Sequence, residues 1–248
     1  MRGSLIRIVL TVVAVAVVSL AWAQDEGFTA AEQAEIAAAA TAAPAPGVIG
    51  DPVPHPDAWD APEATIFFSD FEADNGGLVG SLDWEWGTYA WAGTCGTSYP
   101  PAAAYSGSNM WGTVLNECYN NLGNNGGYST CVSTDPTDDS IVTLTVDLTG
   151  YTDAQLSWWE WLDVYMNFDW AEVYVNGDVV FQHCGTGYVI PTAWVQQVVD
   201  LTPYVGGLAI VEFHMLSSTV VERAGWYIDD LEVSGTPVPV ELQSLTVE

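Results

Sequence analysis

Basic residues are nearly absent from this 248-residue chain, which has no lysine and three arginines against 32 acidic residues. Arg2 and Arg7 both precede the first acidic residue, Asp25. Without the first 23 residues, Arg223 is the single cation and the formal net charge is −31. Such a chain cannot neutralise phosphate groups, which excludes nucleic acids as partners and electrostatic docking onto anionic lipid.

Long apolar runs are also scarce, and the one that exists, Ile8–Ala23, is shorter than the roughly 20 residues that a spanning helix needs. Arg2 and Arg7 precede it, and it ends in Ala21-Trp22-Ala23, a small-x-small cleavage pattern. We therefore predict a signal peptide over residues 1–23 and a secreted or cell-surface mature chain without a membrane span. A retained membrane anchor is the alternative.

Cysteine is sparse but even in number, which suits disulfides in an oxidising compartment. No Cys-x-x-Cys pair or nearby histidine indicates zinc. Three connectivities are possible, and we favour Cys118–Cys131 with Cys95–Cys184.

Proline and alanine are concentrated before the folded part. We predict an Ala/Pro-rich linker over 24–62, because its prolines prevent long regular elements. A domain follows over 63–236, and 49% hydrophobic content argues against disorder there. Residues 237–248 form either a linker with the start of a truncated element or a strand that pairs elsewhere.

The pattern within 63–236 has a period of two residues, with no helix of useful length. Asn176-Gly177 between two short apolar runs is a strong hairpin signal. The pattern predicts an all-β, two-sheet antiparallel β-sandwich of jelly-roll type. The expected strands are 65–72, 82–91, 109–116, 141–148, 155–164, 171–181, 193–201, 209–216 and 225–233.

Several motifs within 66–234 resemble bacterial MAM-like jelly-roll domains. They are Asp83-Trp-Glu-Trp-Gly87, Ser106-Gly-Ser-Asn-Met-Trp-Gly-Thr113 and the closing Gly225-Trp-Tyr-Ile-Asp-Asp-Leu-Glu-Val233. Such domains occur in exported adhesins and as accessory domains of secreted metallopeptidases. The resemblance implies a module without chemistry of its own. The four cysteines are not a general feature of that family.

Calcium is the most specific site prediction. Strict alternation would place Asp229 on the face of Leu231 and Val233, inside the core, where an unpaired carboxylate costs several kcal/mol. With one cation in the mature chain, a divalent ion is the available compensation, and oxygen ligands favour calcium. Alternatively, the acids lie at strand ends, solvated or accepting backbone N–H bonds.

In the opening strand, Asp70 and Glu72 follow Ile66 and Phe68 on the same face. First and last strands are often neighbours in a jelly roll. The resemblance likewise implies a calcium ion between an opening-strand Glu and the closing Asp-Asp. The predicted metal ligands are Asp70, Glu72, Asp229 and Asp230.

Tryptophan is abundant. Trp84 and Trp86 share one face of a predicted strand, as do Trp159 and Trp161, with Trp158 opposite. Exposed rings would stack on sugars, whereas buried rings would fill the core, which is the expected role of most of them. A candidate ligand-binding rim near strand ends comprises Tyr165, Asn167, Asp169, Trp170 and Trp194.

Enzymatic signatures are absent, so we predict no catalysis. Glu160 and Asp163 are three residues apart and face opposite sides of a strand, while Glu172 belongs to another strand, unlike a retaining glycosidase pair. His183 and His214 are isolated in apolar strands and are expected in the core. The sequence contains neither Gly-x-Ser-x-Gly nor His-Glu-x-x-His.

Three functions therefore stay open. The first is adhesion to or recognition of an extracellular protein, by a module stabilised by structural calcium. The second is carbohydrate binding, which needs aromatic rings exposed on one face. The third is an accessory role beside a secreted hydrolase. The ligand and the oligomeric state are open at this stage.

Overall fold

The computed structural model describes residues 64–92, 96, 98–123, 140–166, 168–183, 189, 191–219 and 222–238. The predicted signal peptide, the linker and the tail beyond residue 238 lie outside this part. Within it, no helix is both long and apolar enough to cross a bilayer.

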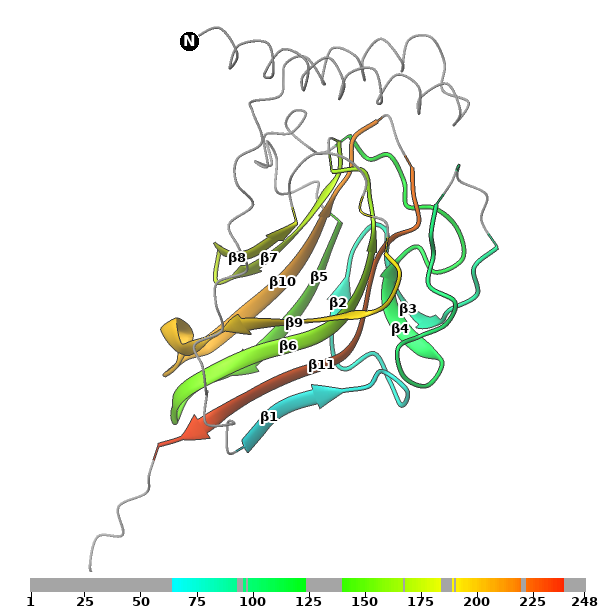
Figure 1. The fold of residues 1–248 in the computed structure, drawn as a ribbon. Coiled ribbons are helices and arrows are strands. Elements are labelled where there is room, and N and C mark those ends of the chain that lie inside the picture. The colour runs from blue at the N-terminus through cyan, green and yellow to red at the C-terminus, as the bar shows by residue number, and fades with distance from the viewer. Residues whose placement is uncertain are drawn as a thin grey trace, which may run out of the picture.

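Two antiparallel sheets pack face to face, which confirms the predicted β-sandwich (Figure 1). The first sheet has the order β3-β4-β11-β6-β9, and β1 also pairs with β11. Its strands are β1 (Ala64–Ser69), β3 (Trp84–Thr88), β4 (Asn109–Thr113), β6 (Tyr151–Asp163), β9 (Val195–Asp200) and β11 (Gly225–Pro237).

The second sheet has the order β2-β5-β10-β7-β8. β9 is an edge strand of the first sheet, and β8 is an edge strand of the second. A short 3-10 turn (Thr202–Tyr204) connects β9 to β10. The strands of the second sheet are β2 (Val79–Gly80), β5 (Ser140–Asp147), β7 (Trp170–Val175), β8 (Asp178–His183) and β10 (Leu208–Leu216).

The predicted hairpin is present between β7 and β8, where Val175 pairs with Asp178. The turn residues Asn176 and Gly177 have φ values of 51° and 89°. Positive φ at both central positions is the type I′ requirement that Asn-Gly satisfies. Each predicted strand range overlaps an observed strand, and 171–181 overlaps both β7 and β8, whereas the two-residue β2 was not predicted.

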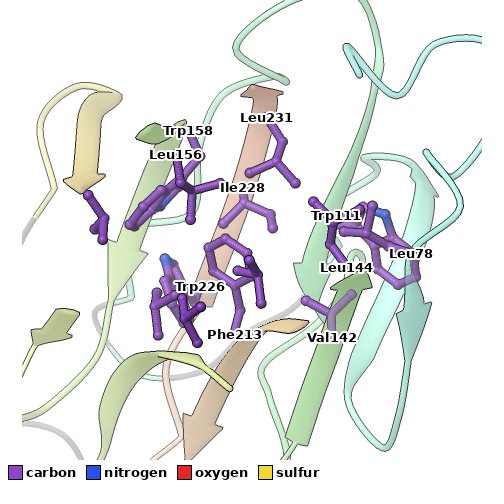
Figure 2. Close-up of a cluster of buried hydrophobic side chains, with 14 of the residues drawn as sticks. Leu78, Trp111, Val142, Leu144, Leu156, Trp158, Phe213, Trp226, Ile228 and Leu231 are labelled. Carbon is purple, nitrogen blue, oxygen red and sulfur yellow. The ribbon is translucent and has the colours of Figure 1, made fainter. Parts of the chain in front are cut away.

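The core lies between the sheets (Figure 2). Trp158 is fully buried there, and Phe213 meets it edge to face with ring centroids 5.2 Å apart. Complete burial of such side chains contributes roughly 1.5–3 kcal/mol each. A smaller buried cluster, Met110, Leu115, Ala224 and Tyr227, lies outside this core.

A β-bulge in β11 overturns the predicted facing of the closing acids. The register to β6 shifts between Asp229 and Glu232, and Asp230 has φ 44°. Ile228 and Leu231 both join the main core, although strict alternation would separate them. Tyr227 and Asp229 therefore lie on the outer face of the first sheet, and the assignment of Asp229 to the Leu231 face was wrong.

A second irregularity corrects the opening strand. The register of β1 shifts between Thr65 and Phe67, so that Phe67 packs against the core while Phe68 is 54% exposed. Asp70 follows as an exposed residue. The expected inward face of Phe68 and Asp70 was wrong because one bulged residue exchanges the two faces. The predicted pairing of the first and last strands is confirmed.

Candidate binding surface

Three of the four predicted metal ligands contact one loop, Tyr105–Asn109. Glu72 Oε1 accepts hydrogen bonds from the backbone N–H groups of Asn109, at 2.6 Å, and Ser108, at 2.8 Å. These bonds, led by that of Asn109, lower the pKa of Glu72. A Cβ on Gly107 would clash with the Glu72 carboxyl group, so the loop approaches this acid closely.

The two closing acids hold the same loop from the sheet side. Asp229 accepts from the N–H groups of Ser106, at 3.1 Å, and Asp230, at 2.8 Å, and Asp230 accepts from the Ser106 hydroxyl at 2.7 Å. Asp229 is fully buried, and burial raises its pKa to about 7. The acids thus fasten a loop to the outer face of the sheet.

The donor set suits a hard cation in its chemistry, since each carboxylate offers about four lone-pair sites and these acids use only some of them. Arg223, the only arginine or lysine in the part that the structure describes, is bonded elsewhere. Among the described residues, however, no group of three or more His, Cys, Asp or Glu side chains is arranged to hold a metal ion. Asp70 is exposed, and structural calcium stays a prediction.

Three of the five residues of the predicted ligand-binding rim are not on the surface. Tyr165, Asp169 and Trp170 are buried, and Asn167 lies outside the described residues. Asp169 accepts hydrogen bonds from the Tyr119 hydroxyl and the Ser218 N–H, and burial raises its pKa to about 7. Tyr165, Phe168 and Asp169 between β6 and β7 point into the interior, which their position in the sequence near a strand end could not reveal.

Trp194, the remaining residue of that prediction, belongs to a group of aromatic side chains over the outer face of β6. Tyr105 stacks on Trp159 with ring centroids 4.0 Å apart and an interplanar angle of 12°. Trp194 meets Tyr105 and Trp161 edge to face, at 6.1 Å in each case. With Tyr99, these form what we call the aromatic platform: Tyr99, Tyr105, Trp159, Trp161 and Trp194.

Hydrogen bonds and a buried ion pair hold Tyr99 in place. The Trp161 indole donates to the Tyr99 carbonyl at 2.7 Å, and the Tyr99 N–H donates to Asp163. Asp163 is ion-paired with Arg223 at 2.7 Å, and the guanidinium carbon lies 5.8 Å from the centre of the Tyr99 ring. Tyr99 and Tyr105 keep 40% and 39% of their surface exposed. Both tyrosine rings are therefore backed by fixed groups and open to solvent.

The remaining tryptophans divide between core and surface. Trp84 and Trp158 are buried, as expected for most of them. Trp86 is 38% exposed and donates to the Phe71 carbonyl, away from the aromatic platform. Sequence reasoning missed Tyr99 and Tyr105, because they lie in a loop and only its fold brings them over β6.

The carboxylates considered for catalysis lie in separate hydrogen-bond networks. Glu160 is bonded to His183 and Asp163 to Arg223, while Glu172 accepts from Tyr174 and Gln182. His183 is a quarter exposed at its side chain, so its placement in the core was wrong. His214 is buried, as predicted.

Cys118 is disulfide-bonded, and Cys95, Cys131 and Cys184 lie outside the described residues. The predicted connectivity stays a prediction.

No family model matches the chain, so the resemblance to MAM-like domains also stays a prediction. Over 170 residues the chain is 27% identical to Bacillopeptidase F of Bacillus subtilis (strain 168). The match covers 66% of this chain and 10% of that protein. The chain thus corresponds in length to a small part of its relative.

Similar solved structures are jelly-roll carbohydrate-binding and adhesin domains. The CBM22-1 xylan-binding domain of Paenibacillus barcinonensis Xyn10C matches with a TM-score of 0.40 at 13% identity, over 71% of this chain and 97% of that one. The K3 cleaved adhesin domain of Lys-gingipain from Porphyromonas gingivalis matches with a TM-score of 0.38 at 17% identity, over 69% and 100%. These likenesses concern the fold alone.

Proposed function

We propose that this chain is a non-catalytic binding module of an exported protein, and that its aromatic platform binds a neutral carbohydrate. The observation that carries the proposal is the stack of Tyr105 on Trp159, which presents an exposed ring held from behind. The signal peptide predicted over residues 1–23 supports export.

Outward positions on a solvated sheet face are usually polar, so aromatic side chains at such positions indicate a binding role. Here Trp159 and Trp161 occupy successive outward positions of β6, and loop tyrosines extend the apolar area. Exposed apolar patches with polar surroundings commonly mark binding sites. Flat, rigid aromatic rings lose little conformational entropy when they stack on the C–H face of a pyranose.

Charge limits the ligand to neutral glycans. The mature chain is strongly acidic, and Arg223 is already bonded to Asp163 beneath Tyr99. Uronic acids, sulfated sugars and acidic protein surfaces would meet repulsion without a compensating cation. A neutral hydroxyl-rich chain meets no such repulsion.

A protein ligand is the second candidate. The aromatic platform is also compatible with a protein interface, because tyrosine and tryptophan are enriched at the centres of such interfaces. The similarity to part of a protein named as a peptidase supports the accessory-domain alternative. In each case the module binds rather than reacts.

Structural calcium is also part of the proposal. Binding of the ion would have to draw Glu72, Asp229 and Asp230 together, because these acids do not surround one point in the described structure, and it would stiffen the loop that carries Tyr105. Oxygen-only donors and the shortage of cations support this assignment. The ion would supply charge compensation and no chemistry.

The proposal is tested by affinity electrophoresis and calorimetry with neutral polysaccharides, comparing the wild-type chain with Tyr105→Ala. We expect the substitution to weaken binding about tenfold or more, equivalent to about 1.4 kcal/mol. Phe68→Ala is the matched control, because it removes an exposed aromatic ring of the same sheet outside the aromatic platform. Equal affinities of Tyr105→Ala and the wild type would reject the platform as the site.

A further inference from the structure

We propose that a pocket between the edges of the two sheets, at β6, β8 and β9, binds a single neutral sugar unit. The ligand class rests on the proposed function, whereas the site is separate from the aromatic platform. The observation that carries the inference is Glu160, a buried carboxylate in the pocket wall whose hydrogen-bonding capacity is filled by four donors.

The pocket has a volume of about 270 Å³ and walls of two kinds. Polar side chains of Glu160, His183 and Gln197 line one part. Another part is apolar and comprises Leu162, Val189, Pro191, Ala193 and Val195. Pockets for drug-sized ligands measure roughly 300–1,000 Å³, so this one suits something smaller, such as one pyranose ring.

Glu160 is bonded on both oxygens. Oε1 contacts His183 Nε2 at 2.6 Å and accepts from Gln197 Nε2 at 2.8 Å. Oε2 accepts from the indole N–H groups of Trp158, at 3.2 Å, and Trp226, at 3.0 Å. A carboxylate has about four lone-pair sites, and these four partners occupy them.

This saturation decides which ligands the pocket accepts. An ammonium group finds no vacant lone pair on Glu160, and an anion would meet its negative charge. A neutral polyol meets neither obstacle. Glu160 is therefore a positioning residue, which orients His183 and Gln197 toward the ligand.

His183 and Gln197 carry the polar atoms that a sugar needs. Because His183 Nε2 and Gln197 Nε2 donate to Glu160, the imidazole Nδ1 and the amide oxygen can accept hydrogen bonds from sugar hydroxyl groups. The apolar wall suits the C–H face of the ring. A mainly apolar pocket with a few polar groups that fix orientation is the usual form of a small-ligand site.

The pocket and the aromatic platform lie on opposite faces of the same strand. Glu160 and Leu162 point into the pocket, whereas Trp159 and Trp161 point outward. The two sites can therefore be altered separately.

The test uses the indole N–H signals of Trp158 and Trp226 in ¹H–¹⁵N spectra, because both groups report on Glu160. A panel of neutral monosaccharides is added at about 50 mM, since single-sugar binding in the millimolar range corresponds to only about −4 kcal/mol. We expect at least one sugar to shift both signals in a saturable way.

Gln197→Ala should weaken this binding at least tenfold, and His183→Ala provides a second variant. Gln196→Ala is the matched control, since the exposed neighbouring side chain lies on the other side of β9 and should leave the titration unchanged. Unchanged unfolding midpoints would show that the variants fold.

Three outcomes would overturn the inference. They are the absence of any shift across the panel, shifts that persist in Gln197→Ala, and a response to methylammonium instead of sugars. Rejection of the pocket can be told apart from rejection of the aromatic platform. The platform is tested with polysaccharides and Tyr105→Ala, whereas the pocket is tested with monosaccharides and Gln197→Ala.

Discussion

The ring of Tyr105 lies nearly parallel to the indole of Trp159, 4.0 Å away, although one belongs to a loop and the other to β6. The loop reaches this position because Asp229 and Asp230 accept hydrogen bonds from Ser106. Acids that are far from the exposed ring in sequence therefore control its placement.

Replacement of the supporting ring tests this relationship. Trp159→Leu should weaken polysaccharide binding several-fold although Tyr105 itself is intact, because the tyrosine loses the surface that fixes it. Calorimetry with the same polysaccharide measures the effect. Leu replaces apolar area but cannot stack, so unchanged affinity would show that the stack is irrelevant to binding.

The buried Arg223–Asp163 ion pair beneath Tyr99 should make a large contribution to the free energy of unfolding. Arg223→Met leaves Asp163 buried and unpaired, which should lower the free energy of unfolding by about 3–5 kcal/mol in urea titrations. Arg223→Met combined with Asp163→Asn removes the charge as well and should recover much of the loss. A loss below about 1 kcal/mol, typical of an exposed pair, would contradict this account.

Stability should decrease as pH rises from 5 to 8. Burial raises the pKa of Asp169 to about 7 from its ordinary 3.8, so the folded state holds a proton that the unfolded chain releases. The resulting stabilisation is complete below pH 3.8 and is lost as pH rises through 7, by up to about 4 kcal/mol.

Thermal unfolding across this pH range measures the dependence. Asp169→Asn should make it shallower, because the amide keeps the shape without titrating, while Asp229, whose pKa burial also raises to about 7, keeps part of the slope. A profile as steep in Asp169→Asn as in the wild type would assign the pH dependence to other acids.

Calcium should raise the unfolding midpoint if the predicted ion binds. A ligand bound only by the folded state stabilises it by about 2.7 kcal/mol at a hundredfold excess over its Kd. Asp229→Asn should abolish most of the shift, while Asp178→Asn, at an exposed position of β8, should retain it. An identical midpoint in calcium and in EGTA would reject structural calcium.

Local sequence signals predicted local structure well. Asn176-Gly177 specified its hairpin because both residues tolerate positive φ. The predictions that failed depended on an unbroken alternation. Phe68 and Asp229 were assigned to the core face, yet bulges in β1 and β11 exchange the faces there. A bulge needs only one extra residue and leaves no distinct pattern in these segments.

The sequence by itself determined an all-β, strongly acidic chain, because alternation of apolar residues and the count of charges are properties of the chain alone. Only the tertiary structure decided which residues share a site. Tyr105 meets Trp159, and Glu160 gathers His183 and Gln197, through strand pairings and loop positions that join distant segments. Those contacts arise from the packing of two sheets, which no short stretch of sequence encodes.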